Sequence, residues 1–344
     1  MRSLLTVVLL LALTGSAGSA TKPKRAPTPA GPIEAIAMDG PRVAFDVGAR
    51  FRPGPTCNKV YVWNVVTGAV QTVSGKATCQ ADNSSTGQGV RELALAGKRV
   101  AWIANVGGNS ESDDYLYTAS LPKPRERRVA FARRTGVVGS FLAGDWIGGL
   151  VGAGNLLAVN TWTTAGPKSM VLTATLSRFD AGGVHPIASG VDSMVARSTD
   201  GARIAVLRTN GTVGIYSSAG ALQGQVTPSS SKEIALRGDL LAVLTKTRTI
   251  EVFNSHTGAR LHAWPVPSAA AHLDLAGNLA AYSLGRQIHL LNVRTGRDNV
   301  LDALTQRVAA VELEPQGLVY AVNKRLGRRT VGRLFFIPMK RLLR

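Results

Sequence analysis

A short sequence pattern recurs seven times along the chain and limits the folds that it can adopt. Each copy has a glycine, an alanine four positions later, and an apolar or aromatic residue after that alanine. The seven copies begin at Gly40, Gly97, Gly154, Gly201, Gly238, Gly277 and Gly317. Glycine permits a tight turn with positive φ, and alanine lets neighbouring sheets approach closely. The pattern therefore predicts a turn followed by a strand that is buried near the middle of the molecule.

The spacing of the copies predicts the architecture. The glycines lie 57, 57, 47, 37, 39 and 40 residues apart, which indicates a repeated unit of about 40 residues. Around the fifth copy, four short strands are expected before residue 238 and over 240–244, 249–253 and 260–266. We therefore expect an all-β protein, a seven-bladed β-propeller of four-stranded antiparallel blades. A β-sandwich also has many short strands, but seven copies of one unit favour the propeller.

The two ends of the chain complete this plan. Residues 1–20 are expected to be a signal peptide, 21–32 a flexible, basic, proline-rich leader, and 33–344 the propeller. The last copy shows three strands, over 309–313, 318–322 and 333–337. Its fourth strand comes from 339–344 or from the leader, whose prolines make a poor strand, or the last blade is three-stranded. The sequence leaves these alternatives open.

The first twenty residues have the features of an export signal. Arg2 precedes an apolar run over 4–13, and small residues around Ala20 offer a cleavage site. The run is shorter than the roughly 20 apolar residues that span a bilayer. We therefore expect a protein that is secreted or lies in the periplasm or cell envelope. The alternative is an uncleaved membrane anchor.

The only two cysteines, Cys57 and Cys79, are expected to form a disulfide, because an isolated pair in an exported protein usually does so. The alternative is two free thiols. Cys57 falls between the second and third strands of the first blade, and Cys79 falls before the next blade. Both connections leave a propeller on the same face. Inserted loops at 48–58, 74–89 and 107–113 belong to that face as well, and it is our candidate binding surface.

One stretch resembles a known repeat. Residues 198–206, Ser-Thr-Asp-Gly-Ala-Arg-Ile-Ala-Val, resemble the WD40-like repeat of TolB-type bacterial propellers, with Thr199 in place of the usual proline. Segments ending at Gly68, Gly258 and Gly296 close with Asn-x-x-Thr-Gly, where propeller families often have Asp-x-x-Thr-Gly. The resemblance covers 33–340 as a repeat and implies the propeller fold. TolB has an additional α/β domain that we do not expect here, so its partners are not carried over.

The sequence assigns no catalytic, cofactor-binding or metal-binding residue. The five histidines have no zinc spacing, and no Gly-x-Ser-x-Gly nucleophile motif is present. The acidic residues Glu111, Asp113 and Asp114 lie together in an inserted loop, and a calcium site there is the alternative to an ordinary solvated loop. We therefore expect no cofactor.

Basic residues crowd the last blade, and the whole chain has a formal net charge of +19. The candidate polyanion-binding residues are Arg328, Arg329, Arg333, Lys340 and Arg341. Such a patch attracts anionic polymers, and a peripheral contact with a membrane surface is a further expectation. Specific nucleic-acid binding is not expected, because only 6% of residues are aromatic. The alternative is an ordinary solvated basic surface.

Two functional hypotheses remain. The first is a monomeric, secreted, non-enzymatic propeller that acts as a binding scaffold for a protein or an anionic cell-envelope polymer. The second is a propeller enzyme, a hydrolase or lyase, with its site at the central channel. Three or more acidic or histidine side chains meeting at the axis would favour the enzyme, whereas a channel lined by alanine, valine and leucine would exclude it.

Overall fold

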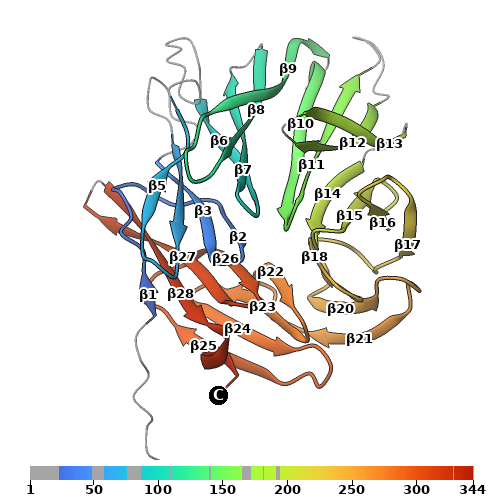
Figure 1. Cartoon of the computed structure of the whole chain (residues 1–344). Helices are drawn as coiled ribbons and strands as arrows, with labels where there is room; N and C mark the ends of the chain where they lie inside the picture. The colour runs from blue at the N-terminus through green and yellow to red at the C-terminus, as the bar shows by residue number, and fades with distance from the viewer. Residues whose placement is uncertain are drawn as a thin grey trace, which may run out of the picture.

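The computed structural model describes residues 23–48, 58–75, 87–107, 111–138, 141–164, 172–180, 182–190, 194–327 and 329–343. Within these residues the chain forms 28 strands and one short helix, α1 (Met339–Leu342). The strands form antiparallel sheets arranged around a common axis, as in a β-propeller (Figure 1). No helix of the described residues is long and apolar enough to cross a membrane.

Five sheets of the described residues have four strands each. From the axis outward, one contains β2 (Ile36–Asp39), β3 (Arg42–Val47), β4 (Lys59–Asn64) and β5 (Val70–Thr72). A second contains β14 (Met194–Thr199), β15 (Arg203–Arg208), β16 (Val213–Ser217) and β17 (Leu222–Val226). A third contains β18 (Glu233–Arg237), β19 (Leu240–Leu244), β20 (Thr249–Asn254) and β21 (Arg260–Pro265). A fourth contains β22 (Ala270–Ala276), β23 (Leu279–Leu284), β24 (Gln287–Asn292) and β25 (Asp298–Ala303). The fifth contains β26 (Val308–Glu314), β27 (Gly317–Leu326), β28 (Arg329–Pro338) and β1 (Lys24–Arg25).

The second and third repeats share one eight-stranded sheet. It contains β6 (Gly87–Ala96), β7 (Arg99–Gly107), β8 (Glu111–Ser120), β9 (Arg127–Val138), β10 (Phe141–Ala153), β11 (Leu156–Thr164), β12 (Leu172–Asp180) and β13 (Gly183–Gly190). The outer strand β9 and the inner strand β10 are long enough to pair, with Val138 opposite Phe141 and Arg134 opposite Gly144. The expectation of seven separate four-stranded blades is therefore wrong: five blades are separate.

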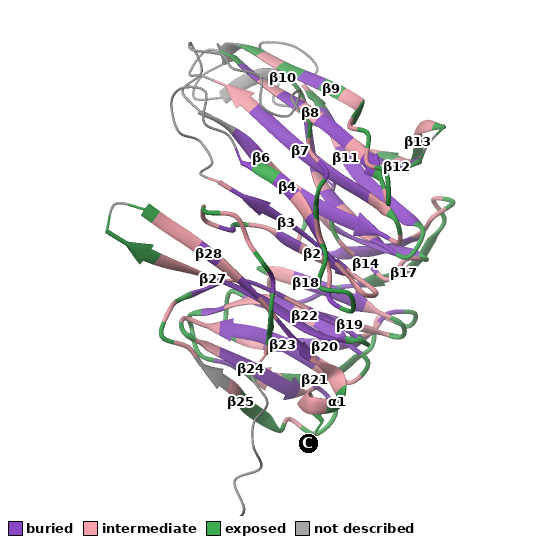
Figure 2. Ribbon diagram, turned by 60° about the vertical axis from the view of Figure 1, so that its left-hand side comes forward, coloured by how far each residue is buried: buried purple, intermediate pink, exposed green. Residues whose placement is uncertain are grey.

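The strands nearest the axis form a closed ring. Each of β2, β6, β10, β14, β18 and β22 contacts the next strand in this series, which ends at β26, and β26 contacts β2. Apolar side chains fill the space between neighbouring sheets, and Figure 2 shows the buried residues running along these strands. The core is therefore divided into clusters that each join one sheet to the next.

The recurring alanine has the predicted role. All seven copies lie in the second strand of their repeat with 0% exposure: Ala44, Ala101, Ala158, Ala205, Ala242, Ala281 and Ala321. Each belongs to a cluster with the inner strand of the following repeat. Ala242, for example, clusters with Leu273 and Leu275 of β22, and Ala321 clusters with Met38 of β2. Alanine is required because a longer side chain would push neighbouring sheets apart.

The leader closes the ring. Lys24 and Arg25 form β1 and pair with Phe336 and Phe335 of β28. The segment expected to be a flexible leader over 21–32 thus supplies the fourth strand of the last blade. The strand is only two residues long and ends before Pro27, because proline cannot donate to a ladder.

Candidate functional site

The inner strands enclose a narrow channel, and all seven of them contribute to its lining. Its middle part is a cavity of about 160 Å³. Polar and charged side chains dominate one side of it, including Arg237 of β18, Asp274 of β22, and Glu312 and Glu314 of β26. The channel is therefore not the purely apolar one that would exclude an enzyme. Sequence reasoning did not find these residues.

The acidic residues of the channel are already engaged with one another and with arginine. Asp274 and Glu312 are hydrogen bonded through their side chains, and burial raises the pKa of both. Burial also raises the pKa of Glu314 to about 7, although its ion pair with Arg237 acts in the opposite direction. Two carboxyl groups so close together share a proton, because both cannot carry a charge in a poorly hydrated place.

Several inner-strand side chains also join one strand to the next. The backbone N–H of Leu150 donates to Glu92 at 2.7 Å, that of Leu273 donates to Glu233 at 2.6 Å, and that of Leu313 donates to Asp274 at 2.6 Å. Ser198 accepts the N–H of Leu236 in the same way, at 2.9 Å. These bonds satisfy buried backbone donors that have no partner in the sheet. The acidic residues therefore have a structural role in closing the ring.

The channel widens where the inner strands begin. A cavity of about 520 Å³ lies against β6, β10 and β14, and one of about 310 Å³ lies against β2, β18, β22 and β26. Arg197 of β14 is the one residue that lines both of these cavities and the narrow channel. We call this region the mouth. It lies at the ends of the strands joined by the inserted loops, which is the face expected to bind a partner.

Irregular strand pairing aims side chains into the mouth. In β14, Ala196 lies opposite Val206 and Ser198 lies opposite Ala205, so Arg197 is an extra residue without a partner in β15. In β6, Arg91 is the extra residue between Val90 and Glu92. Such a β-bulge turns its extra side chain away from the regular alternation of the strand. The bulges therefore explain why two arginines of inner strands project into the mouth.

The larger cavity has an aromatic wall and a glycine floor. Trp146 of β10 lies directly opposite Trp162 of β11, so both indoles are on one face of the sheet. Gly148 and Gly149 follow in a bulge of β10. A Cβ on Gly148 would lie 3.1 Å from Trp162 and from Glu92, and Gly149 has a φ of 63°. The two glycines thus let neighbouring side chains and the backbone of Ala196 approach β10 more closely than any larger residue would permit.

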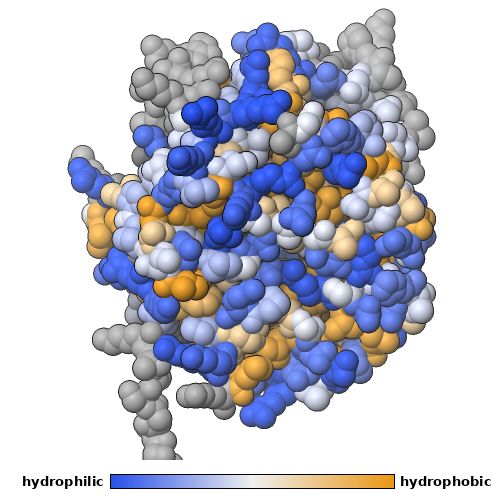
Figure 3. All heavy atoms as spheres, viewed as in Figure 1, coloured by the Kyte–Doolittle hydropathy of each residue, from blue (hydrophilic) through white to orange (hydrophobic). Residues whose placement is uncertain are grey.

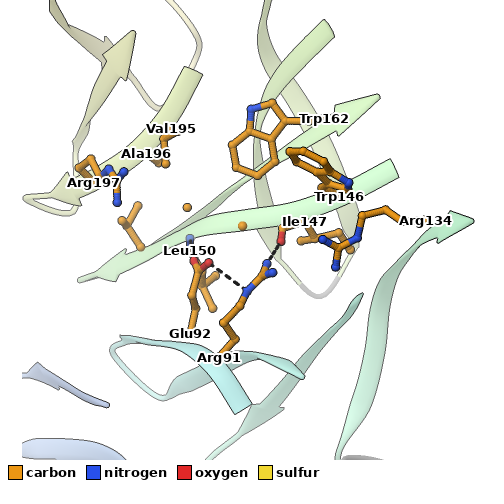
Figure 4. A pocket seen from close by; sticks show the side chains of 13 residues that line it. Arg91, Glu92, Arg134, Trp146, Ile147, Leu150, Trp162, Val195, Ala196 and Arg197 are labelled. Atoms are coloured by element: carbon orange, nitrogen blue, oxygen red, sulfur yellow. Dashed lines mark hydrogen bonds and ion pairs between the residues drawn. The ribbon is translucent and has the colours of Figure 1, made fainter. Parts of the chain in front are cut away.

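The charges of the larger cavity are paired, with one exception. Asp114, which has 0% exposure, lies 3.4 Å from Arg91 and 3.3 Å from Arg134. Arg91 also lies 3.5 Å from Glu92 and donates to the carbonyl of Ile147. Burial raises the pKa of Glu92. Figure 4 shows Arg197 across the cavity from Arg134 and the two tryptophans.

Arg197 is the exception. It is exposed to the mouth and makes no hydrogen bond or ion pair with any residue that the structure describes. The other basic residues of the mouth are engaged: Lys232 donates to the carbonyl of Ala270, and Arg237 is paired with Glu314. A guanidinium is matched in shape and charge to a carboxylate or phosphate. The geometry of the mouth therefore suits an anionic group at Arg197.

The residues expected to bind a polyanion are not gathered in one patch. Arg329 begins β28 opposite Leu326, Arg333 lies midway opposite Val322, and Lys340 and Arg341 belong to α1 beyond the far end. Since β28 has ten residues, its ends are roughly 30 Å apart. The tip of the β27–β28 hairpin projects from the molecule (Figure 2). Arg328 lies outside the described residues.

Both cysteines, Cys57 and Cys79, also lie outside the described residues. Their neighbours show how the two loops begin. Asn58 exchanges hydrogen bonds with Val90 of β6, and Ser74 accepts the N–H of Val60 at 3.0 Å. The end of the 48–58 loop and both ends of the 74–89 loop are therefore held together at one edge of the ring.

The acidic residues Glu111, Asp113 and Asp114, expected in an inserted loop, lie in strand β8 and do not resemble a calcium site. Asp113 accepts two hydrogen bonds from Arg133, at 2.8 and 2.7 Å, and this contact lowers its pKa. Asp114 is the buried partner of Arg91 and Arg134. No group of three or more acidic, histidine or cysteine side chains in the described part of the chain could hold a metal ion.

Over the face seen in Figure 3, hydrophilic residues alternate with small hydrophobic groups.

Comparisons with known proteins support the fold and nothing finer. No protein-family model matches the chain, and no curated protein matches it. The crystal structure of the computationally designed protein Ika8 is similar with a TM-score of 0.51 at 12% identity, over 91% of this chain and 98% of that one. The Saccharomyces cerevisiae protein Sqt1 has a TM-score of 0.47 at 11% identity, over 90% of this chain and 96% of that one. Both are propeller proteins.

Proposed function

We propose that the protein is an exported, non-enzymatic propeller that binds a ligand through an acidic group held by Arg197 in the mouth. The observation that carries this proposal is an arginine without a hydrogen bond or ion pair among the described residues, at the place where three cavities meet; its charge acts only at longer range, on Glu92. An exposed guanidinium that faces a cavity and has no ion pair is free to bind an anionic group there. The ligand class that fits is an anionic cell-envelope polymer.

Within this proposal the eight-stranded sheet counts as two fused blades, β6–β9 and β10–β13, which gives seven. Seven inner strands in the described residues, each in contact with the next, support this count. The TolB-type repeat resemblance of 198–206 remains the family expectation. Export rests on the sequence of residues 1–20.

Two further expectations belong here. A disulfide between Cys57 and Cys79 would hold together two loops whose described ends already meet at Asn58 and Val90. The basic residues Arg329 and Arg341 would add long-range attraction for an anionic polymer, but at separate places rather than as one site. Both depend on the exported location.

The acidic residues of the channel argue for binding rather than catalysis. Asp274 accepts two backbone N–H groups, from Leu275 and Leu313, and Glu314 is paired with Arg237. A general acid or base must be free to reach the proton that it transfers. These carboxyl groups are held in place by the ring itself.

The proposal is tested by calorimetric titration with tricarballylate, a compact tricarboxylate. Wild-type protein is expected to bind it saturably, and Arg197→Gln is expected to lower the affinity at least tenfold. Arg286→Gln is the matched control, because Arg286 is another exposed arginine whose side chain has no partner among the described residues. Equal affinities of wild type and Arg197→Gln would contradict the proposal.

A second candidate, a hydrolase or lyase with its site in the channel, is favoured by one observation. Asp274, Glu312 and Glu314 meet there with raised pKa values, as acids do in some catalytic sites. The test is to incubate the protein with acidic oligosaccharides and to measure new reducing ends. Turnover that Glu312→Gln abolishes would establish the enzyme and overturn the non-enzymatic proposal.

A further inference from the structure

We infer that the larger cavity of the mouth is a binding site for an acidic saccharide, whose ring lies against the tryptophan wall while its carboxylate pairs with Arg197. This inference rests on the proposed function and adds the chemical class of the ligand. The site combines a cavity of about 520 Å³, a pair of tryptophans and a mixture of donors and acceptors. Its volume is within the range of small-molecule sites.

The tryptophan wall is the first argument. Trp146 and Trp162 lie opposite each other in neighbouring strands and both line the cavity. Arg134 lies against one of them, 5.6 Å from the centre of the Trp146 ring. Flat apolar indoles with a polar edge suit ligands that have one apolar face and a rim of polar groups. A pyranose ring has this character, with C–H groups on its face and hydroxyls around its edge.

Exposed indole surface is the second argument. The Nε1 atoms of Trp146 and Trp162 are buried and have no hydrogen-bond partner among the described residues, so a ligand in the cavity does not reach them. Trp162 is only 8% exposed, whereas Trp146 is half-buried. A ligand therefore meets the ring surface of Trp146 above all, which suits the apolar face of a sugar ring.

The charge balance of the cavity is the third argument. Two arginines, Arg91 and Arg134, face two carboxyl groups, Glu92 and Asp114. Arg197 then adds one positive charge beyond this balance, without an ion pair in the described part of the wall. A single carboxylate per sugar ring matches one such guanidinium. A ligand dense in phosphate would bring more negative charge next to Glu92 and Asp114, which disfavours it.

Both kinds of polar group are present for sugar hydroxyls. The arginines offer donors, and the Glu92 carboxyl group offers an acceptor. A hydroxyl donates and accepts at once, so it can use both kinds of partner. A purely anionic peptide would use the donors alone. The saccharide therefore fits more of the cavity than an acidic peptide does.

The inference is tested by saturation-transfer NMR and tryptophan fluorescence with three probes. They are trigalacturonic acid, its methyl ester, which has the same rings without charge, and triglutamate, which has carboxylates without a sugar. Trigalacturonic acid is expected to bind at least tenfold more tightly than either of the others. Binding of triglutamate with equal affinity would overturn the saccharide inference but leave the proposed function intact. Equal binding of the methyl ester would overturn the role of Arg197, and binding of none would overturn both.

Variants of the wall make the test specific. Trp146 is half-buried, so Trp146→Leu is expected to fold, to bind trigalacturonic acid about tenfold more weakly, and to bind triglutamate within twofold of wild type. Trp146→Phe keeps an aromatic face and is expected to recover part of the loss. Trp264→Phe, a half-buried tryptophan of β21 outside the cavity, is the matched control. Equal binding of trigalacturonic acid by Trp146→Leu and wild type would overturn the inference.

Discussion

The ring has an irregular half, from β6 to β14, and a regular half, from β18 to β26. Repeats in the regular half are 37, 39 and 40 residues apart and form separate sheets, whereas the irregular half has longer spacings and a fused sheet. In the regular half the channel charges satisfy one another through Arg237, Asp274, Glu312 and Glu314. The irregular half contains the larger cavity, and Arg197 there makes no hydrogen bond or ion pair with a described residue. The candidate site therefore lies in the half where the repeat spacing is irregular and two blades share one sheet.

The two halves also differ at one matched backbone position. Gly149 in the β10 bulge has a φ of 63°, and His272 in the β22 bulge has a φ of 59°. The backbone shape is the same, but a Cβ on Gly149 would lie 2.9 Å from Asn160 and 3.0 Å from Ala196, whereas the His272 side chain lines the smaller cavity with Lys232 and Glu233. One backbone shape thus permits a close approach between strands in one half and carries a cavity wall in the other.

The largest expected effect tests whether the two halves share the same packing between sheets. Ala242→Leu in the regular half and Ala101→Leu in the irregular half are each expected to lower the free energy of unfolding by about 3 kcal/mol, because both alanines are fully buried against the inner strand of the next repeat. Urea unfolding measures this. Ala259→Leu in an exposed turn is the control. A much smaller loss of unfolding free energy for Ala101→Leu would show that the fused half is loosely packed and that the two halves are not packed alike.

A smaller effect is the pH dependence of the regular half. Because the folded pKa of Glu314 is about 7 and its ordinary value is 4.5, the folded state holds a proton that the unfolded state releases between these values. The resulting stability is complete below about pH 4.5 and is lost as the pH rises through 7. Asp274 and Glu312 act in the same direction, since burial raises both of their pKa values.

We therefore expect the free energy of unfolding to fall by about 2 kcal/mol from pH 5 to pH 8. Glu312→Gln keeps a donor for Asp274 and removes one acid, so the fall is expected to be smaller than in the wild type but to persist, because Glu314 remains. Glu111→Gln, on an exposed strand end, is the control and should follow the wild type. Stability that rises over this pH range would contradict the described burial of the three acids.

The smallest effect compares the two bulges. Gly149→Ala is expected to cost about 2 kcal/mol, because the new Cβ would lie 3.0 Å from the backbone nitrogen of Ala196 and the backbone is left-handed. His272→Gly relieves the same backbone strain while making the unfolded chain more flexible, so its effect is expected to stay within about 0.5 kcal/mol. Urea midpoints measure both. Equal losses of unfolding free energy in the two variants would contradict the view that both bulges have the same left-handed backbone.

The sequence predicted the repeat but not its fusion. Seven glycine and alanine copies identified the turns and the buried second strands, because these depend on local backbone freedom and side-chain size. The pairing of β9 with β10 depends on how far each strand extends, which no local signal determines. The short strand β1 was left as one of several alternatives, since its prolines argue against a strand and only the ring supplies its partner.

The candidate site was less predictable. The mouth opens on the face with the inserted loops, where the sequence predicts the binding surface, but no sequence pattern distinguishes Arg197 and the two tryptophans. Arg197 follows an ordinary alternating strand, and only the extra residue in β14 turns it into the channel. Trp146 and Trp162 become neighbours through strand pairing across sixteen positions of sequence. The pair Gly148-Gly149 within a strand was the one available signal, because such glycines often mark a bulge or a close approach.

The most direct test of the account is a crystal structure of the protein soaked in trigalacturonic acid. The account predicts density for a sugar ring beside Trp146 and Trp162, with its carboxylate on Arg197 in the irregular half. Ligand bound instead in the regular half, beside His272 and Lys232, would contradict it.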